Sequence, residues 1–161
     1  MRMSLLTGAA VSLLSPSLSF AQLAQKPTLT LDAVKRIAAA ADAEATRNNW
    51  KVVIVVVDDA ANLMYLQRNE DAQLGSLHIA QAKARTAALY RRPTKVWADR
   101  LAAEGGTSVL GFPDVIPLEG GIPIIVDGRT IGAVGVSGVT SQQDAQIAQA
   151  GITALMQSLN R

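Results

Sequence analysis

The chain has 161 residues and no cysteine, and its 15 basic and 13 acidic side chains give a net charge of +2. The lack of cysteine excludes disulfides, thiol catalysis, zinc–cysteine sites and covalent attachment of c-type haem. The near-neutral charge and the 4% aromatic content provide no basic surface for nucleic acid, and the length suits one domain around one core.

The first residues have the layout of a secretory signal peptide. Arg2 precedes an apolar run at residues 5–14, and Ser19 and Ala21 supply small residues for a cut after Ala21. The alternative is a membrane anchor, but the run is shorter than the roughly 20 residues that span a bilayer. We therefore expect a signal peptide at residues 1–21 and a mature domain at 22–161, periplasmic or secreted, with no membrane contact after cleavage.

A helix and a hairpin are predicted next. Thr30 can cap a helix that ends in a left-handed turn at Asn48 and Asn49, with apolar positions at helical spacing: Leu31, Val34, Ala38, Ala41 and Ala45. Residues 52–57 are mostly β-branched, which predicts a central strand covered on both faces. Residues 63–68 then form the returning strand of a hairpin.

The middle of the chain predicts two helices. Gly75 and Ser76 open the first helix, whose small and apolar stripe allows close packing: Leu77, Ala80, Ala84 and Ala87. Pro93 starts a short helix that points Val96 and Leu101 inward. Gly105 and Gly106 end that helix, and an ordered proline-containing loop follows at residues 111–118.

A second hairpin and a last helix complete the pattern. Strands at 122–126 and 130–136 flank Asp127 and Gly128, a strong signal for a tight turn. Ser141, with Asp144 three residues later, is expected to cap a helix with four inward residues: Ala148, Ile152, Leu155 and Leu159. Two hairpins interleaved with helices predict an α/β (α+β) domain in which helices pack on an antiparallel sheet.

One face of the second helix is a candidate site. His78, Gln81 and Arg85 are spaced at i, i+3 and i+7, roughly opposite the alanine stripe. The imidazole of His78 could ligate iron, and the guanidinium of Arg85 could pair with a carboxylate. The alternative is a solvated polar face. His78 is the only histidine, so one chain cannot build a multi-histidine metal site.

Glycines mark two further segments. Glu119, Gly120 and Gly121 precede a strand, where bare amides could meet a ligand or a subunit, or where a bulge could simply begin the strand. The glycines at residues 132–138 match neither a dinucleotide fingerprint nor a nucleophile elbow. We interpret this second set as packing and turn devices.

Four segments, in order, are similar to the haem-binding-protein and GlcG-like family, also called domain of unknown function 336. They are Val-Val-Val-Asp at 55–58, Gly-Ser-Leu-His-Ile-Ala-Gln-Ala-Lys-Ala-Arg-Thr-Ala at 75–87, Arg-Pro-Thr at 92–94, and the stretch from Glu-Gly-Gly-Ile-Pro at 119–123 through Gly-Ala-Val-Gly-Val-Ser-Gly at 132–138 to Asp144. The resemblance implies a profilin-like antiparallel sheet of about five strands flanked by helices, assembled into homo-oligomers. Some family members are exported haem binders linked to haem degradation or redox sensing, and others accompany glycolate oxidation or corrinoid adenosyltransferases.

The resemblance makes non-covalent binding of haem, a tetrapyrrole, the leading function. His78 would then be the iron ligand. Five further residues would lie around the cofactor: Arg85, Arg92, Glu119, Gly120 and Gly121. Val115 stands where one haem-binding relative has a threonine, and valine cannot ligate iron, so the ligand has to come from elsewhere. His78 is the leading candidate, and Tyr65, Met64 and Tyr90 are the alternatives. The alternatives are an enzyme or accessory protein for a small glycolate-like acid, with Glu119 or His78 as acid or base, and a structural or signalling partner of another exported protein.

Overall fold

The computed structural model describes residues 25–160, and the predicted signal peptide at 1–21 lies outside these residues. The elements follow the predicted order of helix, hairpin, two helices, hairpin and helix, with one 3₁₀ helix added before the second hairpin. They are α1 (Leu31–Arg47), β1 (Val53–Asp58), β2 (Leu63–Arg68), α2 (Ser76–Tyr90), α3 (Lys95–Ala102), η1 (Gly106–Gly111), β3 (Gly121–Val126), β4 (Arg129–Ser137) and α4 (Ser141–Leu159). No helix within 25–160 is both long and apolar enough to cross a bilayer.

The sheet is antiparallel and has the strand order β2-β1-β4-β3. Both hairpins form as predicted, and Asp127 and Gly128 adopt positive φ angles in the tight turn between β3 and β4. The sheet described has four strands, so the expectation of about five is corrected. The segment before β3 contains Pro113 and Pro117, which have no N–H to donate to a strand neighbour.

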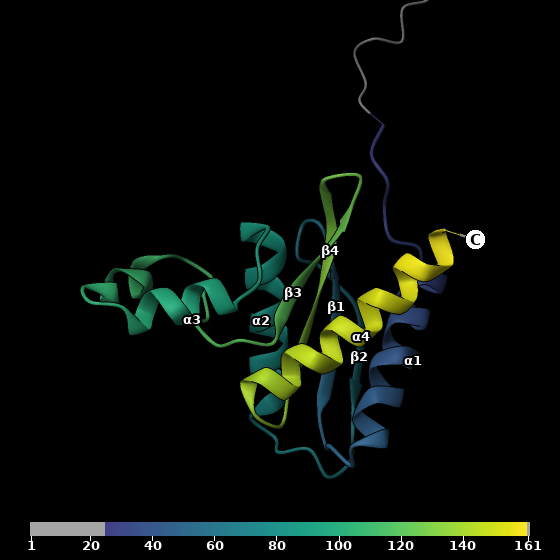
Figure 1. Cartoon of the computed structure of the whole chain (residues 1–161), viewed down its shortest axis with the longest axis horizontal. Coiled ribbons are helices and arrows are strands. Elements are labelled where there is room, and N and C mark those ends of the chain that lie inside the picture. The colour runs from purple at the N-terminus through teal and green to yellow at the C-terminus, as the bar shows by residue number, and fades with distance from the viewer. Residues whose placement is uncertain (1–24, 161) are drawn as a thin grey trace, which may run out of the picture.

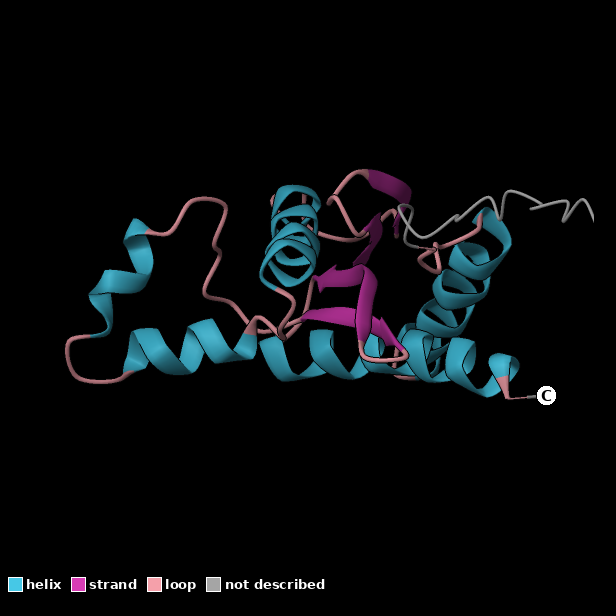
Figure 2. Ribbon diagram, turned by 90° about the horizontal axis from the view of Figure 1, so that it is seen from above, coloured by secondary structure: helices cyan, strands magenta, loops and turns pink. Residues whose placement is uncertain are grey.

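Strand β1 lies inside the sheet and separates two hydrophobic cores. Ile54 and Val56 face the core beneath α1 and α4, whereas Val53, Val55 and Val57 face the core beneath α2. Helices therefore cover both faces of the sheet, as the view from above shows (Figure 2). The prediction of a central strand buried on both sides is confirmed.

The ends and inward faces of α1 and α4 are largely as predicted, with four differences. The Thr30 side chain accepts a hydrogen bond from Ala33 N, so the α1 cap is confirmed. Thr140, not Ser141, caps α4, because Thr140 and Gln143 form a reciprocal capping box. Ile37 is buried in α1 although the prediction omitted it, and the predicted inward residues at two helix ends, Leu31 and Leu159, are exposed.

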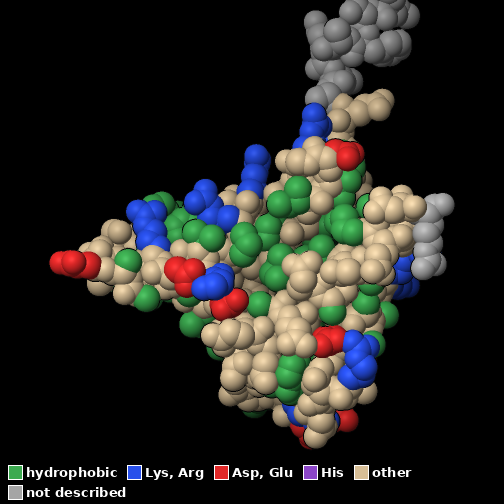
Figure 3. All heavy atoms as spheres, viewed as in Figure 1, with side chains coloured by type: hydrophobic (Ala, Val, Ile, Leu, Met, Phe, Trp, Pro, Cys, Tyr) green, Lys and Arg blue, Asp and Glu red, His purple; other side chains and the backbone are tan. Residues whose placement is uncertain are grey.

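Helix α3 and η1 form an arm, residues 95–111, that extends away from the sheet (Figure 1). Trp97 is the buried residue of α3, so the prediction that Val96 points inward is wrong. The Trp97 ring packs against Tyr90, at 5.0 Å between ring centroids, and against Phe112, at 5.2 Å. Figure 3 shows hydrophobic side chains at the surface of the arm beside basic ones, and the exposed apolar residues include Val96 and Leu110.

Candidate functional site

Helix α2 positions the candidate site because its backbone lies directly on β3 and β4. A Cβ on Gly135 would lie 2.2 Å from the carbonyl oxygen of Ala80, and a Cβ on Gly121 would lie 2.3 Å from that of Lys83. Only glycine permits this approach. The predicted alanine stripe forms the buried face of α2, with Ala80, Ala84 and Ala87 in the core. The opposite face is therefore left to solvent.

A buried ion pair anchors α2 to α4. Lys83 Nζ lies 2.8 Å from Asp144 Oδ2, and both side chains are 2% exposed. Lys83 also donates to the Val136 carbonyl at 3.0 Å, and Asp144 accepts from Val139 N. Burial raises the pKa of the Asp144 carboxyl, while the hydrogen bond and charge of Lys83 act in the opposite direction. Sequence reasoning missed this pair because its members are far apart in the chain.

The exposed face of α2 carries His78 and Arg85 beside an open pocket. The pocket measures about 300 Å³ and is also lined by Gln81, Ala82, Asp114, Val115 and Ile116. His78 is exposed at this surface. The predicted i, i+3, i+7 face therefore lines one hollow, with an imidazole, a guanidinium and a partly apolar wall.

Arg85 is held between two neighbouring segments. Its Nη1 donates to the Ala61 carbonyl at 3.1 Å, and its Nη2 lies 3.7 Å from Asp114 Oδ1. A second hollow of about 210 Å³ lies on the other side of Arg85 and Gln81, toward Ala61 and Leu63. The guanidinium has five N–H donors, and among residues 25–160 it makes polar contacts only with Ala61 and Asp114, so donors remain for a ligand.

The apolar wall is fastened to α2 by two side chains that the sequence did not single out for this role. The Thr86 hydroxyl donates to the Asp114 carbonyl at 2.7 Å and accepts from Ile116 N at 3.0 Å. Tyr90 donates to the Pro113 carbonyl at 2.6 Å. The loop that presents Val115 and Ile116 is therefore ordered, as expected, and its position depends on α2.

The other predicted site residues do not line this pocket. Arg92 lies past the end of α2, where Nε donates to the Tyr90 carbonyl and the guanidinium lies 5.5 Å from the Trp97 ring centroid. Gly120 and Gly121 are buried beneath α2, and Gly121 N donates to Thr94 Oγ1 at 2.9 Å. Glu119 is partly buried next to them. The close approach predicted at these glycines is thus made by the chain's own Lys83 and Thr94.

His78 offers a single imidazole nitrogen, which is too few ligands for a metal ion held by protein side chains alone. Within residues 25–160, no three His, Asp or Glu side chains gather to hold a metal ion. Haem already supplies four porphyrin nitrogens, so a single imidazole is sufficient as its protein ligand. The accessible His78, the neighbouring Arg85 and the apolar Val115 and Ile116 therefore fit haem, although a pocket of this volume can cover only part of a porphyrin.

The fold and the site define a class: a single mixed α/β domain with an antiparallel sheet flanked by helices and an open pocket beside the exposed face of α2. Comparison with known proteins identifies the family to which the chain belongs. A family described as "Haem degrading protein HbpS-like" matches residues 29–153. The chain therefore belongs to this HbpS-like family, which confirms the resemblance to GlcG-like proteins.

Several relatives show how far the likeness extends. Protein GlcG of Escherichia coli strain K12 is 45% identical over 112 residues, which are 70% of this chain and 83% of GlcG. A crystal structure of a double mutant of Streptomyces reticuli HbpS superposes with a TM-score of 0.76 and 31% identity, covering 92% of this chain and 98% of that chain. The crystal structure of the PduOC:heme complex superposes with a TM-score of 0.73 and 30% identity, covering 80% of this chain and 95% of that chain.

Proposed function

We propose that this chain is an exported protein that binds haem non-covalently on the exposed face of α2. His78 ligates the iron, and Arg85 pairs with a propionate. The observation that carries the proposal is the placement of the single histidine of the chain, which is exposed at the same pocket as Arg85 and the apolar residues Val115 and Ile116. The structure of the PduOC:heme complex, 30% identical to this chain, supports the choice of ligand.

The residues at the pocket have separate roles in this proposal. The imidazole of His78 would supply a nitrogen ligand to iron, and solvent exposure leaves this side chain accessible. Arg85 is pre-oriented by Ala61 and Asp114, so less conformational entropy is lost when it binds a carboxylate. Val115 and Ile116 offer apolar contact to a ring, while Thr86 holds their loop in place. When bound, haem would supply redox chemistry at iron, and the chain would supply orientation and charge pairing.

The test is a titration of the purified domain, residues 22–161, with haemin, followed by absorbance. We expect a saturable shift of the Soret band that His78→Ala abolishes and that added imidazole restores. Arg85→Gln should weaken binding about tenfold, because a charge-assisted hydrogen bond is lost. Gln149→Ala on α4 and Arg68→Gln on β2 are matched controls, since both residues are exposed and lie outside the pocket.

Two results would count against the proposal in different ways. No saturable Soret shift would reject haem binding altogether. An unchanged shift in His78→Ala would reject the iron ligand and would move the search to Met64, Tyr65 or Tyr90. The proposed export and homo-oligomerisation are separate expectations, tested by the N-terminal sequence of the secreted protein and by its mass in light scattering.

A further inference from the structure

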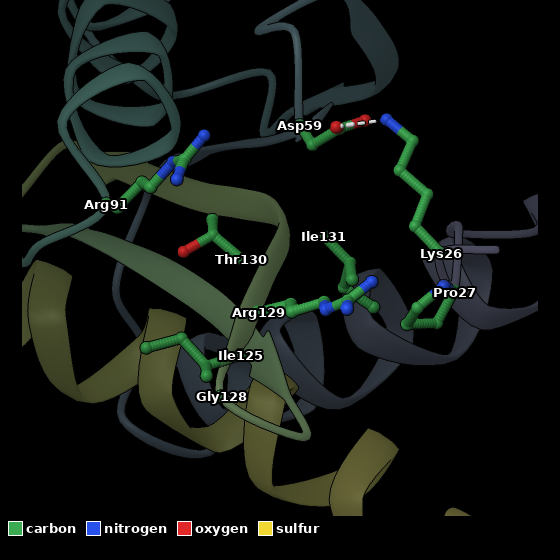
Figure 4. Close-up of a pocket in the computed structure, with 9 residues that line it drawn as sticks. All are labelled: Lys26, Pro27, Asp59, Arg91, Ile125, Gly128, Arg129, Thr130 and Ile131. Atoms are coloured by element: carbon green, nitrogen blue, oxygen red, sulfur yellow. Dashed lines mark hydrogen bonds and ion pairs between the residues drawn. The ribbon is translucent and has the colours of Figure 1, made fainter. Parts of the chain in front are cut away.

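Another pocket, separate from the two hollows beside Arg85, lies where three turns of the chain meet. It measures about 390 Å³ and is bounded by the end of α2, the β1–β2 turn and the β3–β4 hairpin (Figure 4). Its charged side chains come from separate elements: Arg91 from the end of α2, Arg129 from the start of β4, and Asp59 from the β1–β2 turn. Only the fold brings them together.

The lining carries an excess of positive charge. Lys26 Nζ lies 2.5 Å from Asp59 Oδ2, so this lysine and this aspartate neutralise each other. Arg129 Nη1 donates to the Gln25 carbonyl at 3.1 Å, which uses one of its five N–H donors. The Arg91 side chain makes no hydrogen bond or ion pair with the other residues that line the pocket (Figure 4). The two guanidinium groups are therefore left with donors for an anion.

The backbone also presents Arg91 in a defined way. Its φ of 54° and ψ of 38° are left-handed, a conformation that L residues other than asparagine and aspartate adopt rarely. The chain uses it here to end α2, and the Arg91 side chain lines the pocket (Figure 4).

The rest of the lining indicates what kind of anion fits. Ile125 and Ile131 are apolar, and Thr130, next to Arg129, adds a hydroxyl. A carboxylate pairs well with a guanidinium fork, and a short carbon chain matches an apolar surface. A bare phosphate would use the charge but leave Ile125, which is 47% exposed, without an apolar contact. We propose that this pocket binds a short aliphatic dicarboxylate, with Arg91 and Arg129 each pairing with one carboxylate.

This site is independent of haem binding, because neither arginine lines the His78 pocket. The experiment is isothermal titration calorimetry of residues 22–161 with succinate, in 150 mM sodium chloride so that non-specific charge attraction is screened. We expect saturable binding with a dissociation constant below about 1 mM. Butyrate has one carboxylate on a chain of the same length, and it should bind about tenfold more weakly because one charged pair is missing.

Variants locate the site. Arg91→Gln and Arg129→Gln should each weaken succinate binding about tenfold, whereas Arg68→Gln should leave it unchanged. The Arg91→Gln/Arg129→Gln double variant should retain the haemin titration of the unaltered protein, which separates this proposal from the haem proposal. Circular dichroism of each variant shows whether it is folded.

Three outcomes would overturn the proposal. The first is the absence of succinate binding at millimolar concentration. The second is binding that Arg85→Gln weakens and the two pocket variants do not, which would place the acid on α2. The third is inorganic phosphate binding at least as tightly as succinate. That result would mean that charge alone selects the ligand and that apolar contact with Ile125 does not contribute.

Discussion

At the scale of single residues, the Lys83–Asp144 pair shows how much a side chain's role depends on its surroundings. By sequence, Lys83 is one more cation on a polar helix, and Asp144 is part of a helix cap. In the structure, both are 2% exposed, and they contact each other at 2.8 Å. Gly120 packs against them, since a Cβ at that position would lie 2.8 Å from both Lys83 Nζ and Asp144 Cβ. A candidate binding glycine is therefore explained by packing around a buried charge pair.

Removing one charge of this pair is expected to destabilise the fold strongly. Asp144→Asn keeps the shape but leaves the Lys83 ammonium buried without a counter-charge, which costs about 3–5 kcal/mol in the free energy of unfolding. Urea denaturation at pH 7, followed by circular dichroism, measures this loss. Asp99→Asn is the control, because Asp99 pairs with Lys95 at the surface and its loss should cost less than about 1 kcal/mol.

A double variant separates charge from packing. Lys83→Met removes the buried cation, so Lys83→Met/Asp144→Asn should be more stable than Asp144→Asn alone. If the losses of the two single variants simply add, the two groups do not interact energetically, and the anchoring role of the pair is wrong.

At the scale of elements, the contact between α2 and the sheet determines where the candidate site lies. Gly121 and Gly135 remove side chains where the helix backbone approaches, and alanines fill the remaining interface. The buried stripe then leaves His78 and Arg85 on the outer face. Gly121, which was predicted to offer amides to a ligand, is thus used for helix packing, and Gly135 has the packing role that was predicted for its segment.

Gly135→Ala tests this close approach. The added Cβ would lie 2.2 Å from Ala80 O and 2.5 Å from Ala84 N, which are backbone atoms that cannot swing aside. We expect a loss of about 3 kcal/mol in the free energy of unfolding, the upper end of the range for overpacking. Gly111→Ala is the control, since nothing lies within 4 Å of its Cβ position, and it should change stability by less than about 0.5 kcal/mol. Equal stability of the two variants would show that α2 is free to move off the sheet.

At the scale of the whole molecule, the arm, residues 95–111, buries far fewer side chains than the body, which is the sheet with α1, α2 and α4. The body has a core on each face of the sheet, and β1 contributes to both. The arm, in contrast, buries few side chains, chiefly Trp97 and Val109, and α3 packs mainly on η1. Segments with so few buried apolar contacts open at lower free energy than the core.

The arm is therefore expected to unfold before the body. Trp50→Phe leaves Trp97 as the single tryptophan, so fluorescence of this variant reports on the arm while far-ultraviolet circular dichroism reports mostly on α1, α2 and α4. We expect the fluorescence midpoint in urea to fall below the circular dichroism midpoint. Coincident midpoints would instead mean that the aromatic contacts of Trp97 with Tyr90 and Phe112 join the arm to the body in one cooperative unit.

Local pattern was sufficient to predict every α-helix and strand of the described residues, though not the 3₁₀ helix η1, and most of the inward faces. The run of β-branched residues at 52–57 indicated a strand buried on both sides, and Asp127 with Gly128 indicated the turn, because both signals act between near neighbours in the chain. The cap at α4 was misassigned by one residue. Thr140 and Ser141 are both capping residue types, and only the hydrogen bonds of Gln143 distinguish them.

The sequence by itself determined the order of the elements, the two hairpins and the polar face of α2, since each follows from the spacing of residues within one segment. The tertiary structure alone decided which distant groups meet, Lys83 with Asp144 and Arg85 with Asp114, and it alone placed Arg91 and Arg129 at the same pocket. It also separated His78 and Arg85, which share a pocket, from Arg92 and Gly121, which do not. The physical reason is that burial and pairing depend on contacts between segments far apart in the chain, and local periodicity carries no record of those contacts.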